Sequence, residues 1–507
     1  MLAQTSRRDF LRIGIGATVI GGSSADAQYV RIVSGVLSCL KTGFGISGLR
    51  VSNGREIVFT DDEGRYRLPV KEHDIPFIIK PAGYKVPTNS LHIPSLHASI
   101  GEYFFDIALE PQEEPEKFDV FLFADPQPSD EQEVTYLADL VGRAGQNSGP
   151  DFAICLGDLV GDNPAIFSSY DHTMSQLGIP VWNLPGNHDF DFSSNDPLMI
   201  RQTWPKNYGP RTRAFEYGSA TFILLDNVAY VPVTERGYGY IGEIGVDNLA
   251  FISSLLETTA NDRLIILCMH IPLISSEDDT DLSCRTHDYQ QLLSLLSGRR
   301  CISFSGHMHT YEHHLIPCAD GTFHEHKILN AMCGSWWSGP FDELGQPVAQ
   351  SYDGTPKGWY ELSIEGLESK VRFESGRTDS CMRIMVAKQN GSFCDVVERI
   401  RVSELHDARV YVNVFDGGPN TFVKWRVVGH EYGWMSPTDT VDPSTQALFN
   451  KADQSFKPWA KPVVSTHLWK ADFPATLSAG EYKIEVHVIQ QDGQYRKAEI
   501  DVEIIGS

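Results

Sequence analysis

The chain has 507 residues, more than a single hydrophobic core usually organises, so we expect two to four domains. Its composition is that of a globular protein, with 41% hydrophobic and 11% aromatic residues. The formal net charge of −24 argues against binding to a nucleic-acid backbone, because two polyanions repel each other at long range. The same charge does not exclude a small phosphate compound, provided that metal ions supply positive charge locally.

Residues 1–27 have the pattern of an export signal. Arg7 and Arg8 precede a short apolar stretch, and Ala25-Asp26-Ala27 supplies an A-x-A cleavage pattern. The paired arginines indicate the bacterial twin-arginine (Tat) export machinery, so we expect a periplasmic or secreted protein. No later run approaches 18 apolar residues, and we expect no transmembrane segment.

The remaining chain divides into three parts that differ in their pattern of apolar and polar residues. Residues 29–112 alternate apolar and polar residues between turn signals, which predicts an N-terminal β-sandwich, and the acidic stretch 110–117 predicts a linker. Residues 117–367 alternate apolar runs with helix-length amphipathic segments, the pattern of an α/β domain. Residues 369–507 return to alternating segments rich in Thr, Val and Tyr, which predicts a C-terminal β domain.

The nine cysteines include no CxxC pair, so we expect no thiolate metal site. Cys155 and Cys268 lie inside apolar runs and are predicted to be small core residues. Cys381 and Cys394 flank a short segment and could form a disulfide, although spacing alone cannot prove the pairing.

Five apolar runs between residues 117 and 367 end in residue types that bind metals. In chain order these are Asp125, Asp158, Asn187 with His188, His270, and His307 with His309. One such residue at a strand end is most often a turn former, but five in succession are not expected by chance. Because ligands bind at the carboxyl ends of strands in open α/β sheets, the pattern predicts one metal site.

The motifs resemble those of the calcineurin-like metallophosphoesterase superfamily, whose pattern is D-x-H, G-D, G-N-H-D/E, H and G-H-x-H. The matching segments of this chain, in the same order, are DPQ, GDLVGD, GNHD, MH and GHMH. The flanking β domains and the motif CGSWWSG, residues 333–339, are also similar to a bacterial exported subfamily with an N-terminal β-sandwich and a dedicated C-terminal domain. The resemblance implies a central four-layer α/β/β/α domain flanked by two mostly-β domains.

The resemblance further implies a centre of two metal ions. Asp158 would bridge both ions, Asp125 and His309 would hold the first, and the second would be held by Asn187, His270 and His307. Carboxylate, amide and imidazole ligands suit divalent or trivalent Mn, Fe or Zn. Two such ions would generate a metal-bridging hydroxide that attacks phosphorus.

Gln127 stands where the family usually has a histidine ligand. Either it binds the first ion through its amide oxygen, which we favour, or it hydrogen-bonds a bound water. The first ion should then be the more labile one, because an amide oxygen is a weaker donor than imidazole.

Further residues around these ligands are candidates for catalysis, ligand orientation or substrate contact. His188 is expected to stabilise the transition state or protonate the leaving oxygen, the alternative being that it only orients ligands. Asp162 and Asp189 are expected to orient ligands. Trp336 and Trp337 could form an aromatic wall for the leaving group or could pack between domains.

Together these features predict an exported two-metal phosphoesterase acting on a small phosphate ester, with monoester and diester substrates both open. One alternative is a phosphodiesterase acting on phospholipid or nucleotide-type substrates. The other is a non-catalytic envelope or glycan-binding protein on the same fold.

Overall fold

The computed structural model describes residues 31–146, 149–192, 200–233, 237–277, 280–376, 381–390, 393–451, 455–490 and 493–506. The expected export signal, residues 1–27, lies outside this part of the chain. Among the helices in these ranges, none combines the length and the apolar character needed to cross a membrane.

The N-terminal part consists of two small three-stranded sheets. One has the order β4 (Arg65–Val70), β1 (Arg31–Cys39) and β6 (Ile107–Leu109), and the other β3 (Ile57–Phe59), β2 (Arg50–Ser52) and β5 (Phe77–Ile78). In β4 the side chains alternate, with Leu68 buried and Arg67 exposed. This alternation is the period of two that a half-buried strand requires.

The central part is built on two larger sheets. The first has the order β19 (Glu368–Ser375), β18 (Gly358–Glu365), β7 (Lys117–Phe123), β8 (Phe152–Cys155) and β9 (Val181–Asn183). The second has the order β10 (Arg213–Tyr217), β11 (Ala220–Leu225), β14 (Leu264–Met269), β15 (Cys301–Ser305), β17 (Phe323–Ile328) and β16 (Glu312–Pro317). Strands β7, β8 and β9 are parallel, as are β11, β14, β15 and β17, so the loops after them emerge at one edge of each sheet.

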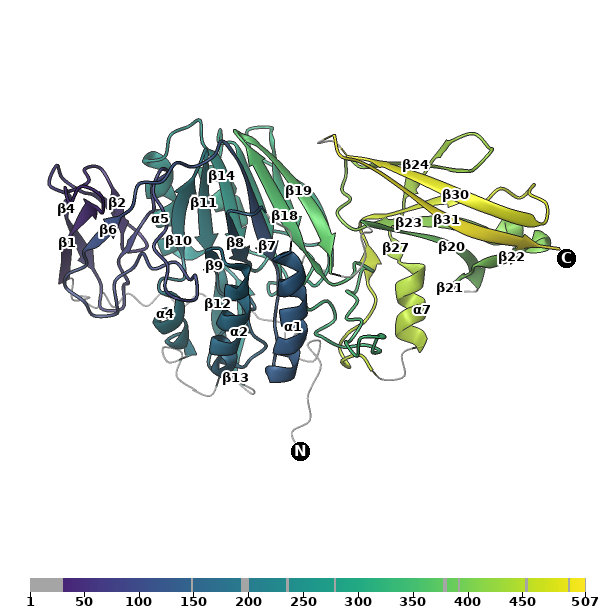
Figure 1. The fold of residues 1–507 in the computed structure, drawn as a ribbon, viewed down its shortest axis with the longest axis horizontal. Coiled ribbons are helices and arrows are strands. Elements are labelled where there is room, and N and C mark those ends of the chain that lie inside the picture. The colour runs from purple at the N-terminus through teal and green to yellow at the C-terminus, as the bar shows by residue number, and fades with distance from the viewer. Residues whose placement is uncertain are drawn as a thin grey trace.

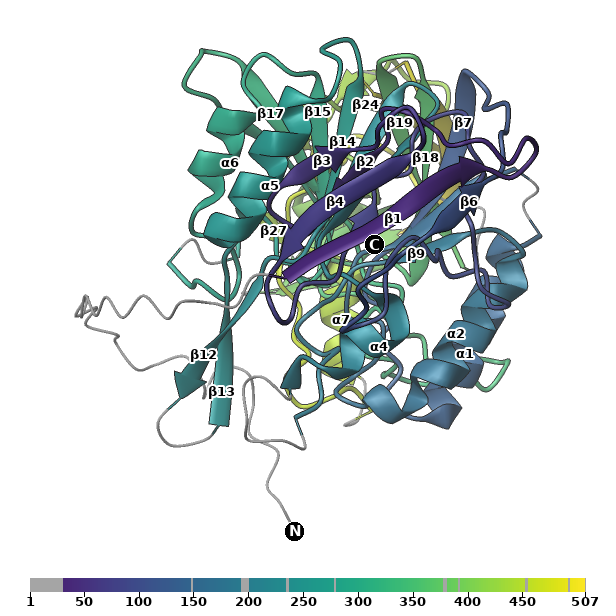
Figure 2. The same cartoon turned by 90° about the vertical axis from the view of Figure 1, so that its left-hand side faces the viewer.

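The two sheets face each other and each carries helices on its outer face, as Figure 2 shows. Leu122 points into the core between the sheets, where it belongs to one cluster with Phe222. Its neighbour Phe121 points to the opposite face and packs with α1 (Glu131–Ala144) and α2 (Phe167–Met174). The second sheet is covered in the same way by α5 (Gly245–Glu257) and α6 (Tyr289–Leu295). The expected four-layer α/β/β/α domain is confirmed.

The central part also contains the helix α4 (Thr203–Tyr208) and a two-stranded ribbon formed by β12 (Val228–Val233) and β13 (Gly237–Gly242). The ribbon directly follows the second sheet's β11 and returns the chain to α5.

The C-terminal part contains two five-stranded sheets packed on a core of their own (Figure 1). The first has the strand order β21 (Phe393–Val396), β20 (Met382–Asn390), β23 (Ala408–Val414), β29 (Leu468–Asp472) and β26 (Ser436–Pro437). The second has the strand order β22 (Arg399–Arg401), β31 (Tyr495–Ile505), β30 (Gly480–Ile489), β24 (Phe422–Val427) and β25 (Gly433–Trp434). The helix α7 (Pro443–Lys451) and a ribbon of β27 (Thr440–Val441) and β28 (Val464–Ser465) lie on the side of this part that faces the central domain.

All nine cysteines lie within the described residues, and all are free thiols. The disulfide considered between Cys381 and Cys394 is therefore wrong. Cys394 lies in β21 opposite Gln389 of β20, and its thiol contacts the Tyr411 hydroxyl. The hairpin brings residue 389, not residue 381, beside Cys394. Cys155 and Cys268 are buried, as predicted.

Candidate metal centre

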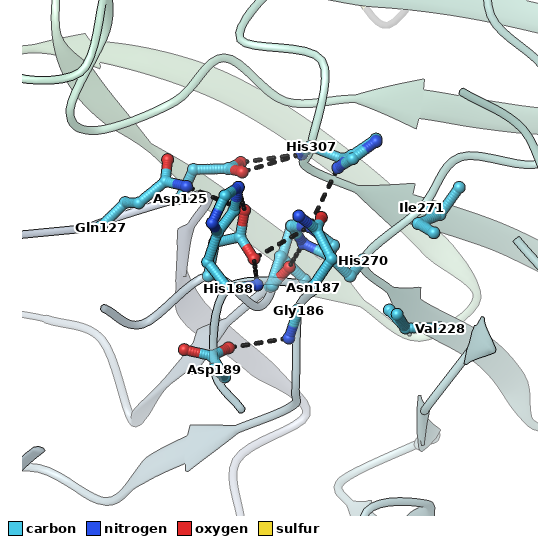
Figure 3. Close-up of polar contacts among 12 residues, drawn as sticks. Asp125, Gln127, Gly186, Asn187, His188, Asp189, Val228, His270, Ile271 and His307 are labelled. Carbon is cyan, nitrogen blue, oxygen red and sulfur yellow. Dashed lines mark hydrogen bonds and ion pairs between the residues drawn. The ribbon is translucent and has the colours of Figure 1, made fainter. Parts of the chain in front are cut away.

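The loops after five strands of the two central sheets bring the predicted metal-binding side chains together. Asp125 and Gln127 follow β7, Asp158 follows β8, Asn187 and His188 follow β9, His270 follows β14, and His307 and His309 follow β15. Figure 3 shows His270, His307 and Asn187 pointing toward one another. All seven predicted ligands are buried, with at most 2% of each residue exposed.

Much of the backbone at this site is in the left-handed region that L-residues seldom adopt. Asp125, Gln127, Asp158, His307 and His309 all have positive φ, between 45° and 75°. Such residues persist only where the surrounding structure holds them, at a cost on the order of 1–3 kcal/mol each. Their concentration at five predicted ligands indicates that the turns are shaped for function.

Glycines in the motifs leave room for the ligands. A Cβ atom at Gly306 would lie 2.3 Å from Asp125 Oδ2, and one at Gly186 would lie 2.2 Å from Asp158 Oδ1. These distances are far below any van der Waals contact, so a side chain at either position would displace a carboxylate. The glycine of GNHD and that of GHMH are therefore required by the close approach of the carboxylates.

Backbone carbonyls fix the protonation pattern of the three predicted histidine ligands. His270 Nδ1 lies 2.8 Å from Leu156 O, His307 Nε2 lies 2.9 Å from Ser283 O, and His309 Nδ1 lies 2.6 Å from Gly334 O. Because a carbonyl can only accept, each imidazole donates through the nitrogen named. The opposite nitrogens, His270 Nε2, His307 Nδ1 and His309 Nε2, are left as electron-pair donors, the arrangement in which histidine binds metals.

The acceptor atoms of the second predicted ion's ligands crowd together. His270 Nε2 lies 3.2 Å from His307 Nδ1, 3.0 Å from Asn187 Oδ1 and 3.3 Å from Asp158 Oδ1. Ligand atoms of Asp158, His270 and His307 all lie within 4.8 Å of one another. Lone pairs at these distances repel unless a positive charge lies between them, so this donor set fits a metal ion.

The electrostatics of the pair His270 and Asp158 lead to the same conclusion. Burial alone would lower the pKa of His270, but the Asp158 carboxylate raises it to about 9. Burial would likewise raise the pKa of Asp158, and the surrounding histidines, His270 first, hold it below its ordinary value. The surroundings of Asp158 therefore favour a positive charge, which a metal ion would supply.

Asp158 connects the two halves of the site. Its Oδ1 accepts from the backbone N–H of His188 at 2.9 Å, and its Oδ2 accepts from Gln127 Nε2 at 3.1 Å. In the first half, Asp125 Oδ1 lies 3.7 Å from His309 Nε2. A carboxylate shared by both halves could bridge two ions.

Gln127 presents its amide nitrogen, not its oxygen, to the Asp158 carboxylate. Its Oε1 lies 3.6 Å from the thiol of Cys333, which donates to it. An amide nitrogen has no lone pair to offer a metal, so ligation through oxygen requires the amide to turn over. Direct ligation by Gln127 stays a prediction.

Cys333 is a site residue that the sequence reasoning missed. It opens the CGSWWSG motif and is fully buried between Gln127 and His309, whose Nδ1 lies 3.8 Å from the thiol. The CGSWWSG motif contributed to the family resemblance, but nothing in the sequence places residue 333 beside residue 127.

His188 is oriented by Asp162. His188 Nδ1 lies 2.7 Å from Asp162 Oδ1, so that Nε2 faces the centre at 4.0 Å from Asp158 Oδ2. Asp189 is directed away from the predicted ligands and accepts from the backbone N–H groups of Gly186 and Val160. It ties the two loops together without reaching the centre.

The two adjacent tryptophans lie in different surroundings. Trp337 packs in the core beneath the first sheet and donates from its indole to Pro126 O at 2.8 Å. Trp336 lies at the site, with its ring 5.0 Å from that of His188 and 5.4 Å from that of His309, between ring centroids. Trp336 thus borders the candidate site and also packs against Trp459 of the C-terminal part, whereas Trp337 packs within the central domain. A role of Trp336 as a wall for the leaving group stays a prediction.

Replacing Gln127 by histidine tests its effect on the first ion. We expect Gln127→His to bind that ion about 10-fold more tightly or better, because an imidazole nitrogen replaces an amide whose oxygen is turned toward Cys333. Metal titration against a chromophoric chelator measures the affinity. Gln132→His, at an exposed position of α1, is the matched control, and equal affinities in the two variants would contradict the expectation.

Comparison with known proteins matches this chain in three consecutive parts. Residues 32–105 match the family model described as the N terminal of calcineurin-like phosphoesterase. Residues 118–311 match the model of calcineurin-like phosphoesterase itself, and residues 325–495 match the model of its C terminal. A 3′,5′-cyclic-nucleotide phosphodiesterase of Nostoc sp. (strain PCC 7120) is 28% identical over 147 residues, which cover 29% of this chain and 50% of that protein. The chain thus aligns with half the length of this relative.

Among solved structures, a purple acid phosphatase from yellow lupin (Lupinus luteus) seeds is similar with a TM-score of 0.38 and 13% identity, over 66% of this chain and 68% of that one. The family models carry the assignment, because they match the N-terminal, central and C-terminal parts in order. The chain belongs to the calcineurin-like phosphoesterase family.

Proposed function

We propose that this protein is a phosphoric ester hydrolase that works with two metal ions. The observation that carries the proposal is the convergence of imidazole nitrogens and an amide oxygen on the buried carboxylate of Asp158. A phosphoesterase family model matches residues 118–311, the part of the chain that holds these groups.

The residues divide into two sets of ligands. Asp125, Asp158 and His309 would hold the first ion, with Gln127 at its edge, and Asp158, Asn187, His270 and His307 would hold the second. When bound, the ions supply charge that polarises phosphoryl oxygens and makes water acidic enough to attack at neutral pH. Mn, Fe and Zn suit this donor set.

His188 is the proposed proton donor to the leaving oxygen. Its Nδ1 is held by Asp162 Oδ1 at 2.7 Å, which fixes the ring and stabilises its protonated form. The proton on Nε2, which faces the centre, would pass to the oxygen of the departing alcohol as the bond to phosphorus breaks. Asp162 then keeps the neutral ring in place for the next turnover.

A diester of the nucleotide type is the second candidate substrate. The similarity to a protein named as a 3′,5′-cyclic-nucleotide phosphodiesterase favours it. A small phosphate monoester remains the alternative, because the same ligands serve both reactions.

Metal removal and a pair of aryl esters test the function. Chelator-treated protein should lose turnover of p-nitrophenyl phosphate and of bis(p-nitrophenyl) phosphate, and added Mn, Zn or Fe should restore it. Faster turnover of the bis ester would support the diesterase. Absence of turnover with every metal would contradict the hydrolase and favour a binding protein on the same fold.

The proton-donor role predicts how a His188→Ala variant depends on the leaving group. Loss of general-acid catalysis should lower turnover of an alkyl phosphate by about 10²- to 10⁴-fold, with a much smaller loss for a p-nitrophenyl ester, whose leaving group needs no proton. Metal content should stay at the wild-type value. His172→Ala, at an exposed position on α2, is the control, and equal losses on both esters would refute the role.

We propose in addition that the protein is exported by the Tat route to the periplasm or medium. The twin arginines, the short apolar stretch and the A-x-A pattern of residues 1–27 support this. Changing both Arg7 and Arg8 to lysine should retain the protein in the bacterial cytoplasm, as measured by fractionation and immunoblotting. Arg12→Lys should leave export intact; unchanged export of the twin-lysine variant would argue against this route.

A further inference from the structure

Trp336 is the aromatic residue that lies against the candidate metal centre. Its ring meets His188 edge-on, with the planes at 90°, and lies nearly parallel to His309, at 16°. It is 9% exposed, so it offers little surface for stacking a substrate. Its contacts include two histidines, one a predicted ligand and the other the proposed proton donor.

The ring of Trp336 is supported from the C-terminal part of the chain. Trp459 meets it at a centroid distance of 5.5 Å and an angle of 81°. Trp336 belongs to a hydrophobic cluster with Tyr352 and Ala460, and Trp459 packs against that cluster. Tyr352 also stacks on His309, at 5.8 Å and 13°. Trp336 and Tyr352 thus both stack on the His309 ring, and Trp459 of the C-terminal part packs against Trp336.

Residues 455–463, which we call the clamp segment, join α7 to β28 and hold the loop that carries Trp336. Three hydrogen bonds connect them: Gly339 N to Ser455 O at 2.9 Å, Lys457 N to Ser338 Oγ at 3.1 Å, and Val463 N to Tyr352 O at 3.0 Å. Two of these bonds are made just after Trp336, at Ser338 and Gly339, and the third is made by Tyr352 itself. Figure 1 shows α7 and the strands beside it against the loops of the central domain.

The backbone of the tryptophan pair explains why such support is needed. Trp336 and Trp337 have φ of 63° and 49°, a conformation that is strained for bulky side chains. Trp337 is fixed within the central domain by its bond to Pro126 O. The ring of Trp336 instead has the Trp459 ring packed against it from the clamp segment. Removing Trp459 would leave a cavity against Trp336 and let the strained turn relax.

We propose that Trp459 is a positioning residue for the metal centre, acting through Trp336 on His188 and His309. The C-terminal part of the chain is then a component of the active site and not an independent module. The kinetic part of this proposal rests on the hydrolase function, whereas its metal-binding part does not.

The test compares Trp459→Ala with Trp434→Ala, which removes an exposed tryptophan, 66% accessible, from β25 of the same part of the chain. In Trp459→Ala we expect about 10-fold weaker binding of one metal ion, since supporting residues of ligands typically matter by 10- to 100-fold. We also expect the ratio of alkyl- to aryl-phosphate turnover to fall, because His188 loses its orientation. Trp434→Ala should match the wild type in both.

Two further variants separate positioning from folding. Trp459→Phe keeps a ring against Trp336 and should recover most of the metal affinity and of the turnover ratio. Trp459→Leu keeps apolar bulk and replaces the alanine variant if that variant does not fold. Thermal unfolding of each variant measures the structural effect alone.

The metal titration decides the proposal even if no ester is hydrolysed. Metal affinity in folded Trp459→Ala or Trp459→Leu equal to that in Trp434→Ala would overturn it. Absence of turnover in the wild type, with weakened metal binding in Trp459→Ala, would refute the hydrolase function and leave the positioning role standing.

Discussion

The buried carboxylate of Asp158 is the constraint on which the rest of this centre depends. It lies beside the imidazole rings of His270 and His307, whose outward nitrogens are committed to backbone carbonyls, so that their lone pairs point inward. His270 Nε2 is 3.3 Å from Asp158 Oδ1 and 3.2 Å from the facing nitrogen of His307. A buried concentration of electron pairs is unfavourable without positive charge, and this requirement explains why a chain with net charge −24 can accept an anionic substrate.

The two facing sheets make this crowding possible. They bring loops from strands far apart in the sequence to one edge, and their buried core holds the loops rigidly. Left-handed turns then direct the side chains inward, and glycines keep the space beside the carboxylates open. The strain in these turns is the local cost of the preorganised ligand set. The turn of Trp336 and Trp337 is strained in the same way. The Trp336 ring is supported by Trp459 of the clamp segment, which the sequence assigns to another domain.

The sequence predicted the layered α/β domain and the identity of the family, because both depend on local patterns: apolar runs, their spacing, and ligand residues at strand ends. It also placed Asp125, Asp158 and the histidines in order along one edge. It could not predict which nitrogen of His270 or His307 faces inward, because the partners are backbone carbonyls of Leu156 and Ser283, which any residue would supply.

Contacts between distant segments were equally hidden. Neither the thiol of Cys333 beside Gln127 nor Trp459 behind Trp336 can be found from spacing, since each pair is joined only by tertiary packing. The disulfide considered for Cys381 failed for the same reason, because the register of the hairpin, not the sequence separation, decides which residues are neighbours.

Anomalous X-ray diffraction from crystals grown with Mn or Zn tests for the two-metal centre, because it locates metal ions without reference to activity. We expect two anomalous peaks about 3.5–4 Å apart, one on each side of the Asp158 carboxylate, with the second ion contacted by His270 Nε2 and His307 Nδ1. Crystals with no peak at Asp158, or with His270 and His307 turned away from it, would refute a two-metal centre at this site.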